Sequence, residues 1–159
     1  MARTHCNTIT MILIKNSQRK IKVDTAQLKR DAQTMLDALD YSDFDLGIWI
    51  TSDVMIRKYN REYRDKDKAT DVLSFPYYPK LKAGERITAE TEEDKNLGDI
   101  IIAPHYVQED LPRWGQTFEQ RLKVLLVHGM CHLLGYDHIE DADYKIMHKK
   151  EIALLRKLK

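Results

Sequence analysis

The sequence predicts an α+β fold, in which a small mixed β-sheet of about four strands has helices packed on it and one helix is central and buried. Two observations predict this fold. Four short apolar runs bounded by turn residues have the length of β-strands. Longer segments repeat apolar residues every three or four positions, the period of a helix that buries one face. At 159 residues, 43% of them hydrophobic, the chain can bury a core as one domain, residues 1–159.

The four strands are predicted from runs of apolar and β-branched residues. These runs are Ile9–Ile14, Leu46–Thr51, Asp71–Phe75 and Leu97–Ala103. Pro76 is expected to stop the third strand, because proline cannot donate a backbone hydrogen bond. The fourth run is apolar along nearly all its length, which is typical of a central strand. The polar stretch Tyr77–Asn96 between them contains Pro79 and Gly84 and is expected to be a mobile loop or loose hairpin.

Five helices are predicted from their first residues and from their periodicity. The first three begin at residues that cap or pre-form a helical turn, namely Asp24 with Gln27, Ser52, and Pro104. Thr117–Leu134 is apolar around much of its circumference, so we expect it to be the buried central helix. Glu140–Lys159 forms a final amphipathic helix. The predicted order is β-α-β-α-β-β-α-α-α.

The run HGMCHLLGYDH, at the end of the central helix, has the spacing of a metal site. His128 and His132 are four residues apart, so on a helix they lie on one face. Gly135 can take the left-handed conformation that ends a helix and turns the chain back toward His138. Three neutral imidazoles and one open position make a catalytic zinc arrangement. The predicted fold is therefore zincin-like, with one metal ion on its central helix; otherwise the first two histidines are ordinary helix residues and His138 lies at the surface.

A glycine occupies the position at which related metal sites carry a catalytic glutamate. Metzincin proteases share this spacing in the pattern H-E-x-x-H-x-x-G-x-x-H, where the glutamate is the general base. Here Gly129 stands in its place. The ligand spacing is protease-like while the acid/base machinery is not, which argues against peptide hydrolysis by the usual route. Zinc lowers the pKa of bound water to roughly 7 without a carboxylate. The metal-activated water could therefore act on a substrate other than a peptide.

Composition indicates in which compartment the protein works, whereas net charge does not indicate which class of molecule it binds. Lys and Arg number 26 and Asp and Glu 25, so net charge indicates no class of partner. Basic residues gather at 57–68 and 15–22, which fits either a face for polyanions or ordinary solvated patches. Two cysteines are too few for a disulfide scaffold. No run approaches the ~20 apolar residues of a membrane span, and no signal peptide is recognisable, so we expect a cytoplasmic protein without membrane contact.

Three separated segments are together similar to one protein family. They are NREYRDKDKATDVLSFP at Asn60–Pro76, LGDIIIA at Leu97–Ala103 and HGMCHLLGYDH at His128–His138. In this order they resemble the YbeY family of endoribonucleases and ribosomal RNA maturation factors, found in bacteria with relatives in mitochondria and chloroplasts. The matches cover roughly the C-terminal two-thirds of the chain. Ala69 departs from the family, which more often has proline there, and this affects loop stiffness more than chemistry.

The resemblance implies a zinc-dependent, single-strand-specific endoribonuclease that acts in small-subunit ribosomal RNA 3′-end maturation and ribosome quality control. It carries His128, His132 and His138 over as ligands of one Zn²⁺, or of another divalent metal, and Arg64 as the catalytic arginine. A guanidinium can also bind a phosphodiester bidentately, although a lone arginine is more often a surface residue. Implied partners are single-stranded ribosomal RNA, the small ribosomal subunit, one of its proteins and an assembly GTPase. We expect a monomer.

Several residues are expected beside the metal site, and two alternative functions are compatible with the sequence. Ser74 and Phe75 are expected to line the floor of the cleft. Asp71 either caps a strand end, the structural role that we favour, or holds Arg64 in orientation. Asp137 either orients a ligand histidine or only shapes the turn. The first rival is a non-catalytic ribosome assembly factor with a structural zinc. The second is a metal-dependent peptidase, which needs a carboxylate from elsewhere, such as Glu140 or Asp141.

Overall fold

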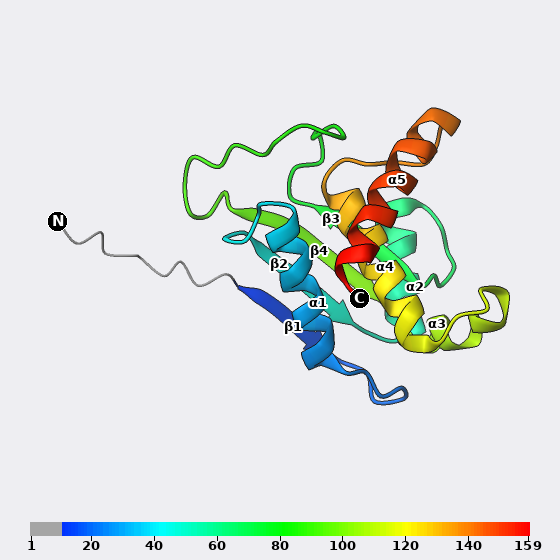
Figure 1. The fold of residues 1–159 in the computed structure, drawn as a ribbon. Helices are drawn as coiled ribbons and strands as arrows, with labels where there is room; N and C mark the ends of the chain where they lie inside the picture. Colours follow the sequence, from blue (N-terminus) through cyan, green and yellow to red (C-terminus); the bar gives the residue numbers. More distant parts are fainter. Residues whose placement is uncertain (1–10) are drawn as a thin grey trace.

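The computed structural model describes residues 11–159 and confirms the α+β fold (Figure 1). Its elements, in chain order, are β1 (Ile12–Asn16), α1 (Thr25–Ala38), β2 (Asp45–Ile50), α2 (Asp53–Arg64), β3 (Val72–Pro76), β4 (Asn96–Ile102), α3 (Pro104–Glu109), the 3-10 helix η1 (Leu111–Arg113), α4 (Phe118–Leu133) and α5 (Asp141–Lys157). Apart from η1, this is the predicted order. None of the helices in the described part of the chain is long and apolar enough to cross a membrane.

The sheet is mixed, with strand order β1-β2-β4-β3. β1, β2 and β4 are parallel neighbours, and β3 runs antiparallel to β4 at one edge. β4 therefore has a strand on each side, and Ile100 at its middle is fully buried, as expected for a central strand. Residues 77–95, which contain neither helix nor strand, connect β3 to β4.

All four strands differ slightly from their predicted bounds; β2 and β4 each begin and end one residue earlier, and the differences at β1 and β3 are informative. β1 begins at Ile12 and continues to Asn16, and the first two residues of the predicted run lie outside the described residues. Pro76 is the last residue of β3 rather than the residue that stops it. The amide of Tyr77 donates to the carbonyl of Leu97 at 3.1 Å, so Pro76, one residue earlier, has its nitrogen on the free side of the edge strand. Proline is tolerated there because no ladder hydrogen bond is lost.

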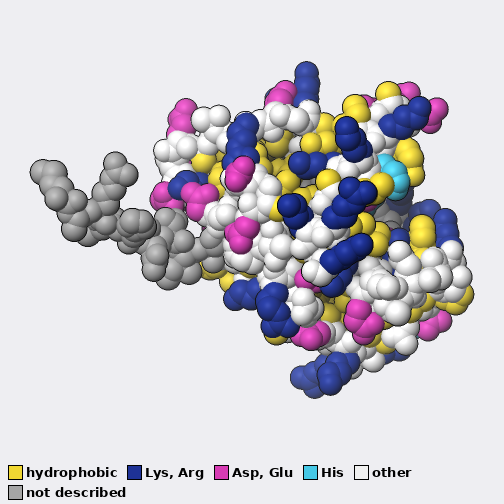
Figure 2. All heavy atoms as spheres, viewed as in Figure 1, with side chains coloured by type: hydrophobic (Ala, Val, Ile, Leu, Met, Phe, Trp, Pro, Cys, Tyr) yellow, Lys and Arg dark blue, Asp and Glu magenta, His cyan; other side chains and the backbone are white. Residues whose placement is uncertain are grey.

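The two faces of the sheet are covered unequally. Helices α1 and α4 pack on one face, α5 packs against both of these helices, and all three share the main core with side chains of β2 and β4 (Figure 1). On the other face a smaller cluster contains Ile56 of α2 together with Leu73 and Ile101 of the sheet. On the helical side, exposed Lys and Arg side chains gather along α5, where Figure 2 shows them over the C-terminal helix. The second face is covered mainly by α2.

Helix α4 is fixed at its start and pressed against the sheet near its end. Thr117 and Gln120 form a capping box, in which each side chain bonds the other residue's backbone amide. Within the helix, Gly129 packs directly on β4, because a Cβ at this position would lie 3.1 Å from the Ile100 side chain. The residue at the position of the protease glutamate therefore serves to pack the helix against the sheet. A larger side chain here would crowd Ile100, which would have to shift to make room for it.

A Schellman turn centred on Gly135 ends α4. The Tyr136 amide donates to the Cys131 carbonyl at 3.0 Å and the Gly135 amide to the His132 carbonyl at 3.1 Å, which are the two bonds of that motif. Gly135 has φ +88°, in the left-handed region. A Cβ at Gly135 would also overlap the carbonyl oxygen of Leu81, where the β3–β4 loop crosses the turn. Both its conformation and this close approach require glycine.

We expect Gly135→Ala to destabilise the chain more than Gly115→Ala. Gly115 also has a positive φ, +61°, but among the residues that the structure describes no atom lies within 4 Å of its missing Cβ, so alanine there meets only the left-handed strain of about 1–2 kcal/mol. Gly135→Ala adds the clash with Leu81, and overpacking of this kind typically costs another ~1–3 kcal/mol. Urea unfolding of both variants measures the difference. Equal losses would show that the loop moves away freely.

Candidate metal centre

A cleft of about 680 Å³ lies where the end of α4 meets the edge strand β3 and the β3–β4 loop. His128 and His132 line it from α4, and His138 lines it from the turn that follows. Ser74 of β3 and Arg64 at the end of α2 line the other side. The structure thus places all four residues predicted to form the site in one cleft.

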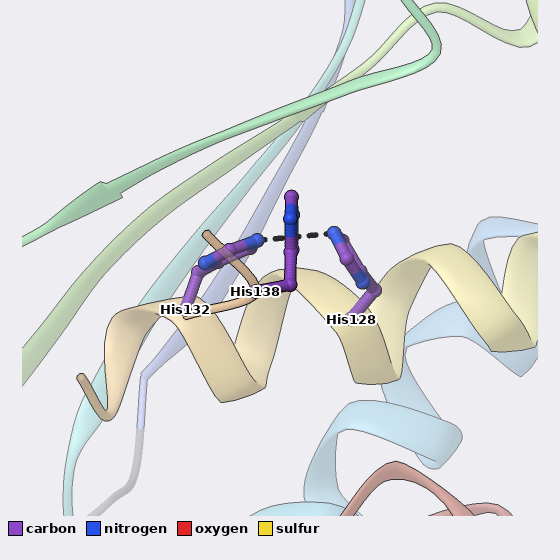
Figure 3. Close-up of side chains that lie close together, drawn as sticks. All are labelled: His128, His132 and His138. Atoms are coloured by element: carbon purple, nitrogen blue, oxygen red, sulfur yellow. Dashed lines mark hydrogen bonds between the residues drawn. The ribbon is translucent and has the colours of Figure 1, made fainter. Parts of the chain in front are cut away.

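The three histidine rings converge on one point. Figure 3 shows His128 and His132 projecting from the same side of α4, with His138 between them from the following turn. The Nε2 atoms of His128 and His132 are 3.0 Å apart. One nitrogen from each of the three rings can be chosen so that all lie within 4.8 Å of one another. Such a set can hold a metal ion.

Hydrogen bonds at the far side of two rings fix which nitrogen can bind a metal. His132 Nδ1 lies 3.0 Å from the Tyr136 carbonyl, and His128 Nδ1 lies 3.2 Å from a carboxylate oxygen of Glu151. Both partners are acceptors, so each Nδ1 carries the proton and each Nε2 presents a lone pair. In these tautomers two lone pairs face each other at 3.0 Å, an arrangement that a cation between them stabilises. Tetrahedral zinc with bonds of roughly 2.0–2.1 Å needs an N···N separation of about 3.3 Å, close to the spacing found.

Burial is the main reason that His132 stays neutral. Burial, together with the neighbouring His128 and His138, lowers the pKa of His132 to about 4. A neutral imidazole at physiological pH is the form that binds metal. Cys131 lies next to His132 in sequence but is fully buried in the core, where burial raises the pKa of its thiol to about 12. It is not part of the cluster.

Arg64 is held at the rim of the cleft by β3. Its Nη2 donates to the Ser74 carbonyl at 2.7 Å, and its guanidinium lies 5.1 Å from the centre of the Phe75 ring. The Ser74 carbonyl faces the free edge of the sheet, so this contact costs no strand pairing. Lys66 and Lys68 line the same cleft from the loop after α2. Buried Asn60 donates to the Lys68 carbonyl at 2.8 Å and so fixes that loop. This side of the cleft is cationic.

The structure corrects one neighbour of the site and clarifies two others. Ser74 lines the cleft as expected, but the expectation for Phe75 is wrong, because successive residues of a strand face opposite sides and Phe75 points to the far face of the sheet. Asp71 pairs with buried Arg121 of α4 at 3.3 Å rather than with Arg64. The Asp137 carboxylate accepts the His138 backbone amide at 2.7 Å and so shapes the turn.

Sequence reasoning missed the two groups that orient the ligands. Glu151 comes from α5, 23 residues after His128, and nothing in its local pattern marks it. The Tyr136 carbonyl is a backbone group that becomes available only through the turn at Gly135. Glu140, considered as a carboxylate for a peptidase, is exposed at the start of α5. In the chain from residue 11 onward, no carboxylate belongs to the histidine cluster.

Comparisons with known proteins agree on one family. The family model described as Endoribonuclease YbeY matches residues 13–159. The human Endoribonuclease YbeY is 37% identical over 147 residues, covering 92% of this chain and 87% of the human protein. The Endoribonuclease YbeY of Desulforamulus reducens is 38% identical over 151 residues, covering 92% and 96%. A solution structure from Thermotoga maritima is 26% identical, covers 93% of this chain and 89% of that one, and superposes with a TM-score of 0.60.

We expect changes at Glu151 to weaken metal binding without removing the ligands. Glu151→Gln keeps an acceptor for His128 but removes its charge, and Glu151→Ala removes both. Loss of a group that orients a ligand histidine typically costs roughly 10–100-fold in metal affinity, so we expect about 10-fold for glutamine and about 100-fold for alanine. Competition with a chromophoric chelator measures this. Asp143→Asn, on the exposed first turn of the same helix, is the control and should bind as the wild type; unchanged affinity in Glu151→Ala would contradict the assignment.

Proposed function

The chain belongs to the YbeY family, and from this premise we propose that it is a zinc-dependent endoribonuclease that cuts single-stranded ribosomal RNA. The observation that carries the proposal is the cluster of His128, His132 and His138, with two free Nε2 atoms aimed at one point, beside Arg64 in a cationic cleft. The proposed task is 3′-end maturation of small-subunit ribosomal RNA and ribosome quality control. It places the chain in the cytoplasm with the small subunit, one of its proteins and an assembly GTPase as partners.

The donor set fits a catalytic rather than a structural zinc. Structural zinc sites are closed by four protein ligands, whereas catalytic sites have three and leave one position open. The described residues supply three histidines and no fourth ligand. His138 is also exposed, so the cluster opens to the cleft. This favours an enzyme over an assembly factor that uses zinc only for folding.

The residues of the cleft divide the work on a phosphodiester. A bound Zn²⁺ supplies Lewis-acid chemistry at the reacting phosphate. Arg64, held by the Ser74 carbonyl and the Phe75 ring, presents its remaining N–H groups to the phosphoryl oxygens and stabilises the charge that develops on them. Lys66 and Lys68 attract the RNA backbone to the same rim.

Gly129 occupies the position of the protease base, so no carboxylate is present there. Cleavage of RNA does not depend on a carboxylate base in the way that peptide hydrolysis does. The Gly129 position is filled by helix–sheet packing, which disfavours the peptidase alternative. RNA can use its own 2′-hydroxyl as the nucleophile, or water can attack directly. The product ends distinguish the two routes, because a 2′,3′-cyclic phosphate excludes direct attack by water as the cleavage step.

We expect His132→Ala to abolish cleavage of single-stranded RNA and loss of the metal to accompany it, while the chain remains folded. The reason is that two remaining imidazoles cannot hold the ion in place. Wild type and variant are purified side by side and compared by RNA cleavage, metal content and thermal melting. His148→Ala, an exposed histidine of α5 outside the cluster, is the control for histidine removal. Equal cleavage by His132→Ala and wild type would assign the activity to a contaminant or to another site.

We expect Arg64→Ala to lower the rate of cleavage about 100-fold at unchanged metal content, the size of effect that removal of a charge-stabilising donor has. Arg64→Lys keeps the charge but not the bidentate geometry, so it should recover only part of the rate. Arg61→Ala is the matched control, since Arg61 is exposed on the same helix and pairs only loosely with Asp67 at 3.8 Å. If Arg64→Ala cleaves at the wild-type rate, Arg64 has no part in the reaction.

A further inference from the structure

We propose that an aromatic pocket on the opposite face of β3 is a subsite that binds one unpaired base of the RNA. The pocket has a volume of about 320 Å³ and is lined by Trp49, Tyr59, Tyr63, Phe75, Asp99 and Ile101. It lies on the face of the sheet away from the histidines, across the edge strand. The proposal rests on the proposed function, because it assigns part of the same RNA substrate to this pocket.

The pocket exists because the second face of the sheet is only partly covered. Strand register places Trp49 beside Ile101, and Gly47 and Phe75 on either side of Asp99. Helix α2 contributes Tyr59 and Tyr63 and forms one wall. Gly47 has no side chain, and a Cβ there would overlap the Asp99 carboxylate, which therefore lies over the glycine. The sheet thus contributes two aromatic rings, one aliphatic side chain and one carboxylate to the pocket.

Four aromatic rings line the pocket in a continuous row. Trp49 and Tyr59 meet edge to face with centroids 5.3 Å apart, Tyr59 and Tyr63 stack at 5.8 Å, and Tyr63 meets Phe75 edge to face at 5.4 Å. Tyr63 is 59% exposed although it is a large aromatic residue. Exposed aromatic faces held by one another are platforms on which bases of single-stranded RNA stack, because every base has a π-face.

Charge favours a nucleotide over an apolar protein segment as the occupant. Lys15 Nζ lies 5.1 Å from the Trp49 ring centre and the Arg64 guanidinium 5.1 Å from that of Phe75, so a cation stands at each end of the row. Asp99 lies inside, and within residues 11–159 its carboxylate has no hydrogen-bond or ion-pair partner. Partial burial accordingly raises the pKa of Asp99. Phosphates suit the two ends, and the amino group of adenine or cytosine suits the carboxylate.

Arg64 connects this pocket to the metal cleft. Arg64 lines the cleft, and its guanidinium lies over the Phe75 ring of the pocket. The same guanidinium donates to the backbone carbonyl of Ser74, the neighbour of Phe75 in the edge strand. Because β3 is an edge strand of the described sheet, no strand from residues 11–159 separates the two hollows. A phosphodiester bound at Arg64 therefore has a route for a neighbouring nucleotide around the edge and onto the aromatic row. By binding this neighbouring base, the pocket would determine which phosphodiester of the RNA lies at the metal.

The test uses the fluorescence of Trp49 in the full chain carrying Trp114→Phe, so that the remaining tryptophan lies in the pocket. The probes are short 2′-O-methyl oligoadenylate, oligouridylate and an abasic chain of equal length, none of which offers a free 2′-hydroxyl. We expect oligoadenylate to quench Trp49 and the abasic chain to leave it unchanged. Tyr63→Ala should weaken oligoadenylate binding about 5- to 150-fold, the range found when a stacking side chain is removed.

Two variants keep the test sharp. Tyr144→Ala removes a tyrosine that is 52% exposed on α5, a helix that contributes no residue to the pocket, and should bind as the wild type. Asp99→Asn should reduce the preference for adenylate over uridylate while retaining Trp49 quenching. RNA cleavage is measured separately. Cleavage without quenching, or equal binding by Tyr63→Ala and Tyr144→Ala, overturns the subsite and leaves the proposed function standing. Quenching that depends on Tyr63 in a chain that cleaves nothing supports the subsite and removes the catalytic proposal.

Discussion

The left-handed turn at Gly135 is the constraint on which the arrangement of the site depends. Helix α4 ends at Leu133, and the turn then sends the chain back along the helix and so brings His138 to face His128 and His132. The same turn directs the Tyr136 carbonyl to His132 Nδ1, which sets the protonation of that ring. Because Gly135 has no side chain, the β3–β4 loop can also pass close to the turn at Leu81. One residue without a side chain thus determines ligand position, ligand protonation and the closure of the cleft.

A second glycine explains why the site resembles that of a protease in its ligands and differs in its chemistry. Gly129 lies on the side of α4 that faces the sheet, and a Cβ added there would come within 3.1 Å of Ile100. A glutamate at this position would therefore conflict with the core rather than reach the cleft. Polar help for the histidines comes instead from Glu151 on α5, which bonds the far nitrogen of His128. In this fold the carboxylate orients a ligand, and the cleft presents arginine and lysine to its substrate. That division suits an anionic backbone better than a peptide.

The sequence predicted those features that depend on local spacing. The histidines and Gly135 lie within eleven residues, and a helix followed by a left-handed turn determines their geometry almost alone. The order of strands and helices followed from periodicity in the same way. Glu151 could not be predicted, because it meets His128 only through the packing of α5 on α4. Phe75 was misplaced because its neighbour Ser74 does line the cleft, and the alternation of a strand sends adjacent side chains to opposite faces.

The unpaired edge of the sheet follows from the same arrangement. A further strand beside β3 would cover both the metal cleft and the aromatic pocket, so the edge must stay open for either to be reached. An open edge invites pairing with other chains, and short length, proline and charge are the devices that prevent it. β3 has all three: it is five residues long, Pro76 presents no amide on the free side, and Arg64 occupies the outward carbonyl of Ser74. The arginine assigned to the phosphodiester therefore also protects the strand, which links access to the site with resistance to edge-to-edge pairing.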